Sequence, residues 1–81
     1  MMIKIRLFAA AKQFAGTDVV EIPANQPISV ATLSDKLIEQ HSELASLMPF
    51  VRFAIDSEYV DSKTLVDPGT EVAVIPPVSG G

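Results

Sequence analysis

The sequence predicts an α+β domain in which one amphipathic helix packs against a mixed sheet of about five strands. Three stretches carry this prediction. Residues 3–7 alternate apolar and basic side chains, the pattern of a strand with one buried face. Residues 30–40 place apolar side chains at helical spacing. Residues 72–75 form a short, wholly apolar run that is typical of a strand in the middle of a sheet.

The first strand has one buried side. Its alternation points Ile3, Ile5 and Leu7 to the core and the basic side chains to solvent. By the same alternation Phe8 points outward, where an exposed aromatic ring would belong to a partner-binding patch. The alternative is that the strand has already ended and that Phe8 folds back onto the core.

Two short elements follow the first strand. The alanine-rich residues 9–15 predict a helical turn that stops at Gly16. Residues 17–22 predict a second strand that ends at Pro23, and residues 24–27 are loop.

The main helix begins after Ser29, a favourable N-cap residue. Its apolar positions recur at helical spacing, so that one face packs on the sheet; they are Val30, Leu33, Leu37 and Ile38. The helix ends near residues 40–41. A short turn packed on the core follows, closed by Pro49; its apolar residues are Leu44, Leu47 and Met48.

The second half of the chain predicts three more strands, separated by turns. The strands are residues 50–55, 58–60 and 72–75, and the turns are Asp56-Ser57 and Asp67-Pro68-Gly69. The first of these strands points Val51, Phe53 and Ile55 inward. Pro68 and Gly69 occupy the positions that a type II turn prefers.

This order of elements matches the β-grasp fold of ubiquitin. In that arrangement the first and last strands are parallel neighbours at the centre of the sheet, which suits the apolar run at residues 72–75. The predicted fold is therefore α+β, a ubiquitin-like β-grasp. We expect a β-grasp domain over residues 1–75 and a flexible, extended C-terminal Gly-Gly tail over residues 76–81.

The tail is suited to entering another protein. Pro76 and Pro77 lack a backbone N–H, so they end the strand and favour an extended path. Residues 78–81 can span roughly 13 Å more at about 3.3 Å per residue. Gly80 and Gly81 have no side chain to obstruct a narrow channel. The residues expected to present the tail are Pro76, Pro77, Val78, Ser79 and Gly80.

The reacting group would be the terminal carboxylate of Gly81. As an anion it is a poor electrophile, so it must first be activated, as in a mixed anhydride with AMP. A sulfur nucleophile attacking that anhydride would leave a thiocarboxylate, and a lysine amine would leave an amide. The chain has no cysteine, no Gly-rich phosphate loop, no Ser–His pair and no metal-spaced cluster. We therefore expect no activity from the chain alone, no bound metal or cofactor, and ATP-dependent activation by a partner.

The net charge and the length of the apolar runs argue against some classes of binding partner. Ten acidic and six basic residues give a formal net charge of −4, which argues against nucleic acid and favours basic protein surfaces. The chain shows no signal-peptide pattern and no run near the roughly 20 apolar residues of a membrane span. We expect a cytoplasmic protein with no membrane partner. The single histidine, His41, is expected to be a residue of the helix end and not a catalytic group.

Residues 71–81, Glu-Val-Ala-Val-Ile-Pro-Pro-Val-Ser-Gly-Gly, resemble the C-terminal signature of molybdopterin synthase small subunits. Residues 2–9, followed by Gly16-Thr17, are similar to the start of that family. The resemblance covers essentially the whole chain, and Pro-Pro-Val-Ser-Gly-Gly is its most specific part. The family usually has an aromatic residue at or beside the position of Ile75, where this chain has Val74 and Ile75.

The resemblance implies a sulfur carrier that works through partners. A ubiquitin-activating-type adenylyltransferase would adenylate Gly81 with ATP, and a sulfurtransferase or cysteine desulfurase system would convert it to a thiocarboxylate. The tail would then enter the large subunit of molybdopterin synthase, within a heterotetramer. There the sulfur would pass to the cyclic pyranopterin precursor to make the dithiolene of molybdopterin. Phe8 and Ile75 are the sheet residues expected to contact the partner.

Three other functions remain open at this point. A Gly-Gly end is shared with ubiquitin-like protein modifiers, whose last glycine forms an amide with target lysines. It is also shared with the sulfur carrier of thiamine synthesis. The third alternative is a β-grasp interaction module whose tail has no chemical role.

Overall fold

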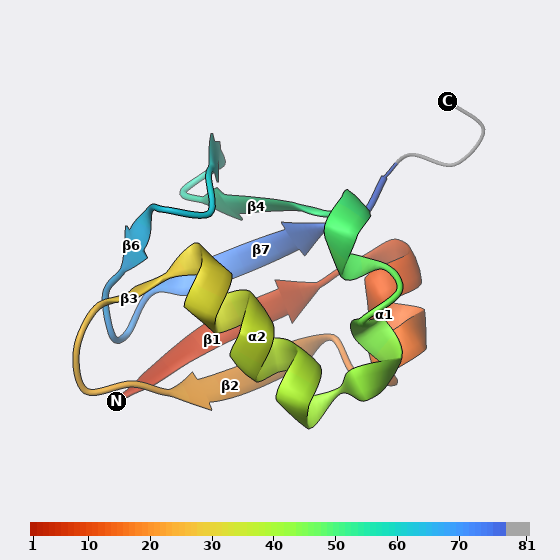
Figure 1. Cartoon of the computed structure of the whole chain (residues 1–81), viewed down its shortest axis with the longest axis horizontal. Coiled ribbons are helices and arrows are strands. Elements are labelled where there is room, and N and C mark those ends of the chain that lie inside the picture. The colour runs from red at the N-terminus through yellow and green to blue at the C-terminus, as the bar shows by residue number, and fades with distance from the viewer. Residues whose placement is uncertain (78–81) are drawn as a thin grey trace.

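The sheet is organised around a parallel pair formed by the first and last strands. The computed structural model describes residues 1–77. In it Ile5 lies opposite Val72 and Leu7 opposite Val74, with antiparallel strands on both sides of this pair (Figure 1). The order across the sheet is β2 (Val19–Pro23), β1 (Met2–Leu7), β7 (Glu71–Ile75), β4 (Arg52–Ile55) and β5 (Glu58–Val60). The predicted central pairing of the first and last strands is confirmed.

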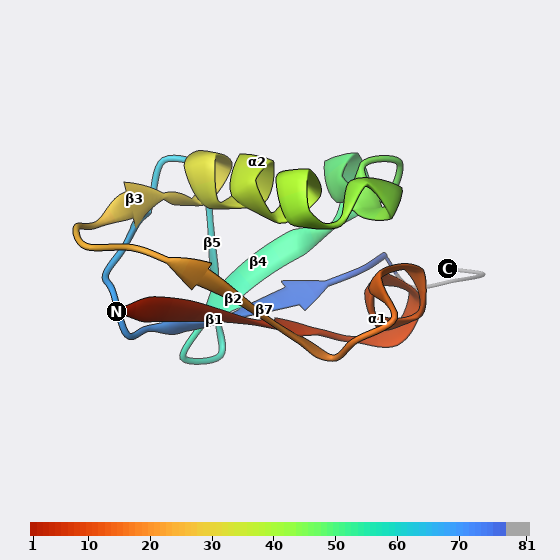
Figure 2. The ribbon, with the colours of Figure 1, turned by 90° about the horizontal axis from the view of Figure 1, so that it is seen from below.

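One face of the sheet is covered by α2 (Val30–Gln40), as Figure 2 shows. The helix begins where predicted, because the Ser29 side chain accepts a hydrogen bond from the Thr32 backbone N–H at 3.1 Å. β1 alternates strictly between exposed and buried residues, so its apolar side meets the apolar side of the helix. The fully buried residues of this core include Ile3, Ile5, Leu7, Leu33, Leu37, Val72 and Val74.

The short helix α1 (Ala9–Ala15) lies at the end of the sheet where β1 finishes (Figure 1). Gly16 ends it in the left-handed conformation, with φ of 74°. Its N–H donates to the Lys12 carbonyl at 2.9 Å, which closes the last helical turn. The predicted helical turn and its stop at glycine are confirmed.

The two predicted turns in the second half of the chain are also confirmed. Asp56 and Ser57 both have positive φ, 51° and 67°, which suits the two-residue hairpin that joins β4 to β5. In the turn before β7, the Thr70 N–H donates to the Asp67 carbonyl at 3.1 Å. Gly69 has φ of 90°, a conformation that favours glycine at this position of a type II turn.

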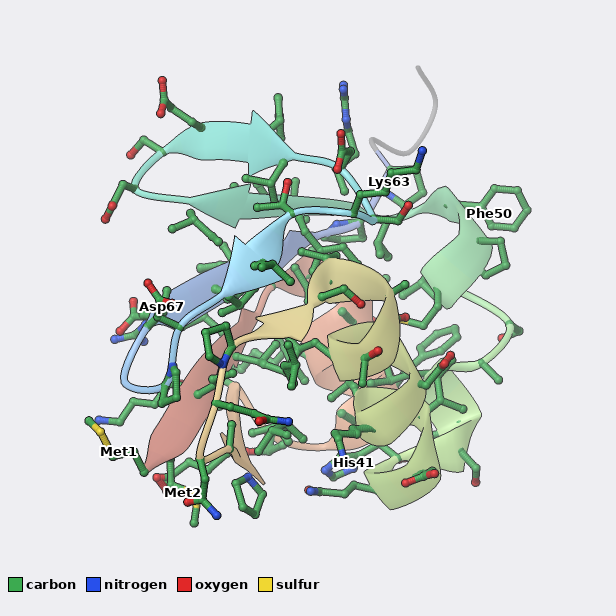
Figure 3. The ribbon with its side chains drawn as sticks, turned by 60° about the vertical axis from the view of Figure 1, so that its left-hand side comes forward. Met1, Met2, His41, Phe50, Lys63 and Asp67 are labelled. Atoms are coloured by element: carbon green, nitrogen blue, oxygen red, sulfur yellow. The ribbon has the colours of Figure 1, made fainter. Side chains whose placement is uncertain are left out.

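The predicted third strand starts two residues too early. Between α2 and β4 the chain makes two 3₁₀ turns, η1 (Ser42–Leu44) and η2 (Met48–Phe50), and β4 starts only at Arg52. Pro49 has the fixed φ that suits the first turn of a helix, so Phe50 belongs to η2. Phe50 is 65% exposed, and its ring points away from the rest of the molecule (Figure 3).

The predicted second strand is also displaced. It begins at Val19 because the Thr17 hydroxyl accepts the Val19 N–H at 3.4 Å, which holds Thr17 in a local turn. Pro23 is the last residue of the strand and not the residue after it. A proline is tolerated there because β2 is an edge strand, whose outward N–H groups need no partner.

Two short strands were not predicted. β3 (Ile28–Ser29) and β6 (Leu65–Val66) pair antiparallel as a separate two-stranded sheet beside the N-terminal end of α2. Two residues are too few to show an alternating pattern. The pairing exists because the chain before α2 runs alongside the chain before β7, with the Val30 N–H bonded to the Thr64 carbonyl at 2.9 Å.

A Leu37→Ala substitution should test how much the contact between α2 and the sheet stabilises the fold. Leu37 is fully buried, so its truncation should lower the free energy of unfolding by about 2–5 kcal/mol, a large part of the stability of so small a domain. Denaturant unfolding followed by circular dichroism would measure this. Glu39→Ala, on the exposed side of the same helix, is the control and should change stability by less than about 0.5 kcal/mol. Equal effects from both variants would contradict the packing described here.

Candidate partner-binding face at the root of the Gly-Gly tail

The face of the sheet opposite α2 is not covered by any helix of residues 1–77 (Figure 2). Strand register shows which side chains share this face. One row across four strands consists of Arg6, Ala73, Ala54 and Tyr59, and a neighbouring row contains Ile75 beside Arg52. In β7 the residues Val72 and Val74 point to the core, so Ala73 and Ile75 point to the open face.

Phe8 lies beside this face at the junction of β1 and α1. β1 ends at Leu7, and Phe8 is the N-cap residue of α1 with extended backbone, its carbonyl accepting the Ala11 N–H at 3.1 Å. Its side chain is 47% exposed. The strand has therefore ended, as one alternative held, but the ring is not folded into the core and stays available for contact.

The structure brings four of the residues predicted for the site together. Phe8, Ile75, Pro76 and Pro77 line a hollow of about 640 Å³ together with Ala9, Ala10 and Gln13 of α1. A second hollow of about 400 Å³ shares Phe8 and Ile75 with it and extends over the sheet; its other lining residues are Ala54, Asp56, Ser57, Glu71 and Ala73. The other predicted site residues, Val78, Ser79, Gly80 and Gly81, lie outside the described residues.

Two acidic residues, Asp56 and Glu71, line the second hollow. The Arg6 Nε donates to Glu71 Oε1 at 3.0 Å, and both side chains are about half exposed. An exposed pair of this kind stabilises the fold little, at most about 1 kcal/mol. On the same face the Arg52 guanidinium lies over the Tyr59 ring, 4.2 Å from its centroid.

Sequence reasoning missed the sheet residues of this face. Ala54, Ala73 and Tyr59 carry no chemical motif, and only their position opposite one another makes them a surface. A signal was available in β7, where Glu71, Ala73 and Ile75 alternate with the buried valines.

The rest of the described chain offers little competing chemistry. His41 is the C-cap residue of α2, and its Nδ1 lies 3.2 Å from Glu43 Oε1, a contact that the sequence analysis did not predict (Figure 3). Within residues 1–77, no three histidine or carboxylate side chains are grouped as a metal site would require. No helix of this part of the chain is long and apolar enough to cross a membrane.

Solved structures establish the fold. SAMP1 from Haloferax volcanii superimposes with a TM-score of 0.88 at 26% identity, with the whole of both chains covered. One chain in a complex of subunits 1 and 2 of the molybdopterin-converting factor from Helicobacter pylori gives a TM-score of 0.70 at 22% identity, again over both whole chains. The predicted ubiquitin-like β-grasp fold is confirmed.

Sequence relatives cover the chain from end to end. The chain is 37% identical to the molybdopterin synthase sulfur carrier subunit of Chlamydomonas reinhardtii, with 100% of both proteins covered. It is 33% identical to the human protein of the same name, over 98% of this chain and 93% of the relative. The family model described as "ThiS family" matches residues 5–81. This chain therefore belongs to the ThiS family, and its predicted resemblance to molybdopterin synthase small subunits is confirmed.

Proposed function

We propose that this protein is the sulfur carrier of a molybdopterin synthase. The observation that carries the proposal is a Pro-Pro-Val-Ser-Gly-Gly sequence placed directly after the central strand β7. The strand that carries the tail, β7, is paired on one side with β1 and on the other with β4, and the open face of the sheet lies beside its end. Full-length relatives named as molybdopterin synthase sulfur carrier subunits support the same function.

The chemistry is confined to the carboxylate of Gly81. An adenylyltransferase transfers AMP from ATP to this carboxylate and releases pyrophosphate. Sulfide-level sulfur from a donor then displaces the AMP and leaves a thiocarboxylate. This chain contains no cysteine, so none of its own side chains can hold the sulfur as a thiolate or persulfide. The glycine hydrogens leave room for the nucleophile at the acyl carbon. These steps take place in the cytoplasm.

The receiving partner is the large subunit of molybdopterin synthase. The thiocarboxylate sulfur bonds to the cyclic pyranopterin precursor in that subunit, and water then cleaves the bond between sulfur and the Gly81 acyl carbon, which returns the carboxylate. The two carriers of a heterotetramer supply the two dithiolene sulfurs of molybdopterin. The open face beside the tail suits such a partner, because Phe8 and Ile75 are adjacent to Pro76 and Pro77. A chain of the same fold occurs in the Helicobacter pylori complex of subunits 1 and 2, which supports a two-subunit assembly.

A second candidate is a protein modifier. The structure superimposes with a TM-score of 0.88 on SAMP1 of Haloferax volcanii. The abbreviation SAMP1 stands for small archaeal modifier protein 1. In that function the activated Gly81 would form an amide with a lysine amine of a target protein. Higher-mass conjugates of the chain in cell extracts would favour this candidate over the carrier.

A Gly81→Val variant should test the carboxylate chemistry. Wild-type protein incubated with ATP, the activating enzyme and a sulfur source should gain about 16 Da as one oxygen is replaced by sulfur. The valine side chain should obstruct attack at the acyl carbon, so the variant should gain nothing in intact-mass measurement. Ser79→Ala keeps both glycines and is the control that should still gain mass. A normal mass gain in the Gly81→Val variant would contradict the steric argument.

A Phe8→Ser variant should test the docking face. Removing a half-exposed ring beside the tail should weaken binding to the large subunit by about tenfold or more, measured by calorimetry. Phe14→Ser is the matched control, because Phe14 is 45% exposed but lines neither hollow. Its affinity should remain within about twofold of wild type. Equal losses from both variants would show that Phe8 has no special part in docking.

A further inference from the structure

The hollow on the open face has a floor of two alanine methyl groups. Ala73 of β7 and Ala54 of β4 are direct cross-strand partners, and the same row continues to Arg6 on one side and Tyr59 on the other. Ala54 is only 6% exposed although α2 lies on the other side of the sheet, because longer side chains stand around it. The small floor beneath taller neighbours makes a hollow of about 400 Å³ that is open to a partner.

The two ends of this hollow differ in chemistry. Phe8 and Ile75 line the end of the hollow nearest the tail. The acidic residues Glu71 and Asp56 line the other end. Glu71 is already paired with Arg6 at 3.0 Å. Asp56 forms no ion pair with any residue of the described chain, and its place in the β4–β5 hairpin is set by the left-handed turn. One carboxylate at the hollow is therefore available to a cation.

The occupant must be the protein that receives the tail. Phe8 and Ile75 also line the neighbouring hollow, which follows Pro76 and Pro77. Gly81 is four residues beyond Pro77, and four residues span at most roughly 13 Å. A protein that encloses Gly81 therefore comes within this distance of the tail root, close enough for its surface to extend over the adjacent hollow.

The lining favours a long cationic side chain. Lysine and arginine have aliphatic stems that pack on apolar surface while their charged ends reach polar groups. The alanine floor suits the stem, and the Asp56 carboxylate suits the charged end. A purely apolar side chain would remove water from that carboxylate without giving it a partner, which is unfavourable. The net charge of −4 favours approach of a basic surface.

We propose that the protein receiving the tail inserts a lysine or arginine side chain into this hollow, with its stem over Ala54 and Ala73 and its charged end at Asp56. The proposal rests on the function proposed above, since it requires a receiving protein. It adds to that function one contact of defined chemistry, between a cationic side chain and Asp56. This contact lies on the sheet and not on the tail.

Binding of the full chain to the molybdopterin synthase large subunit of the same organism would test the charged contact. Asp56→Asn removes the charge, and asparagine tolerates the left-handed conformation at that position. Its affinity should fall by about tenfold or more, with a weaker dependence on salt concentration. Glu58→Gln is the matched control, because it changes the net charge equally two residues away and does not line the hollow. Its affinity should stay within about twofold of wild type.

Filling the hollow would test the contact with the stem. Ala73→Leu should weaken binding by about tenfold or more, because the added carbons occupy the space of the partner's side chain. Val19→Leu is the control, since Val19 lies on the other side of Arg6 in the same row. Thermal unfolding of each variant would establish that it is folded. If Ala73→Leu fails to fold, the comparison of Asp56→Asn with Glu58→Gln still tests the proposed contact.

The outcomes separate this inference from the function it rests on. Normal binding of Asp56→Asn with weakened Ala73→Leu would mean an apolar occupant, and it would overturn the cationic contact. Normal binding of both variants would show that the hollow is not filled. Wild-type protein that neither binds the large subunit nor gains sulfur would instead overturn the proposed function.

Discussion

The parallel pairing of β1 and β7 at the centre of the sheet is the constraint on which the rest of the structure depends. A parallel pair needs a crossover connection, and here the crossover contains every other element of the described chain, including α2. β7 is paired with β1 as far as Val74 and with β4 as far as Ile75, so strands hold it on both sides up to its last residues. The two prolines then leave from a position that the hydrogen-bonded sheet determines.

The same pairing produces the open face of the sheet that we propose as the docking face. α2 buries one side of the central strands, and the other side exposes the alternate residues of each strand. Three separate parts of the chain meet there, represented by Phe8, by Ala54, and by Ala73 with Ile75. Their apolar side chains, with charged residues beside them, suit contact with another protein.

The sequence predicts most of this fold because its strongest patterns are local. Alternation at residues 3–7, the Ser29 cap and the turn at residues 67–69 each depend on neighbours in the chain, and each was confirmed. The pairing of β3 with β6 depends on a tertiary contact that no short pattern contains. The place of Phe50 is a local effect of Pro49, which starts a new turn and does not, as predicted, close the preceding one. The residues of the candidate site also differ in whether the sequence alone identifies them. Phe8 was predicted from the alternation of the first strand and Ile75 from the family resemblance, whereas the alanine floor is apparent only from cross-strand register.

The closeness of the open face to the tail root has a kinetic consequence. In the function proposed above, face and tail would act as two linked binding elements, so that insertion of the tail would become an intramolecular event once the face has docked. With a linker as short as that between Pro77 and Gly81, the effective concentration of the tail at its channel is on the order of millimolar. Neither element then needs high affinity alone. Under the proposed function, such a carrier would engage its partner productively and still dissociate in time to be reloaded with sulfur.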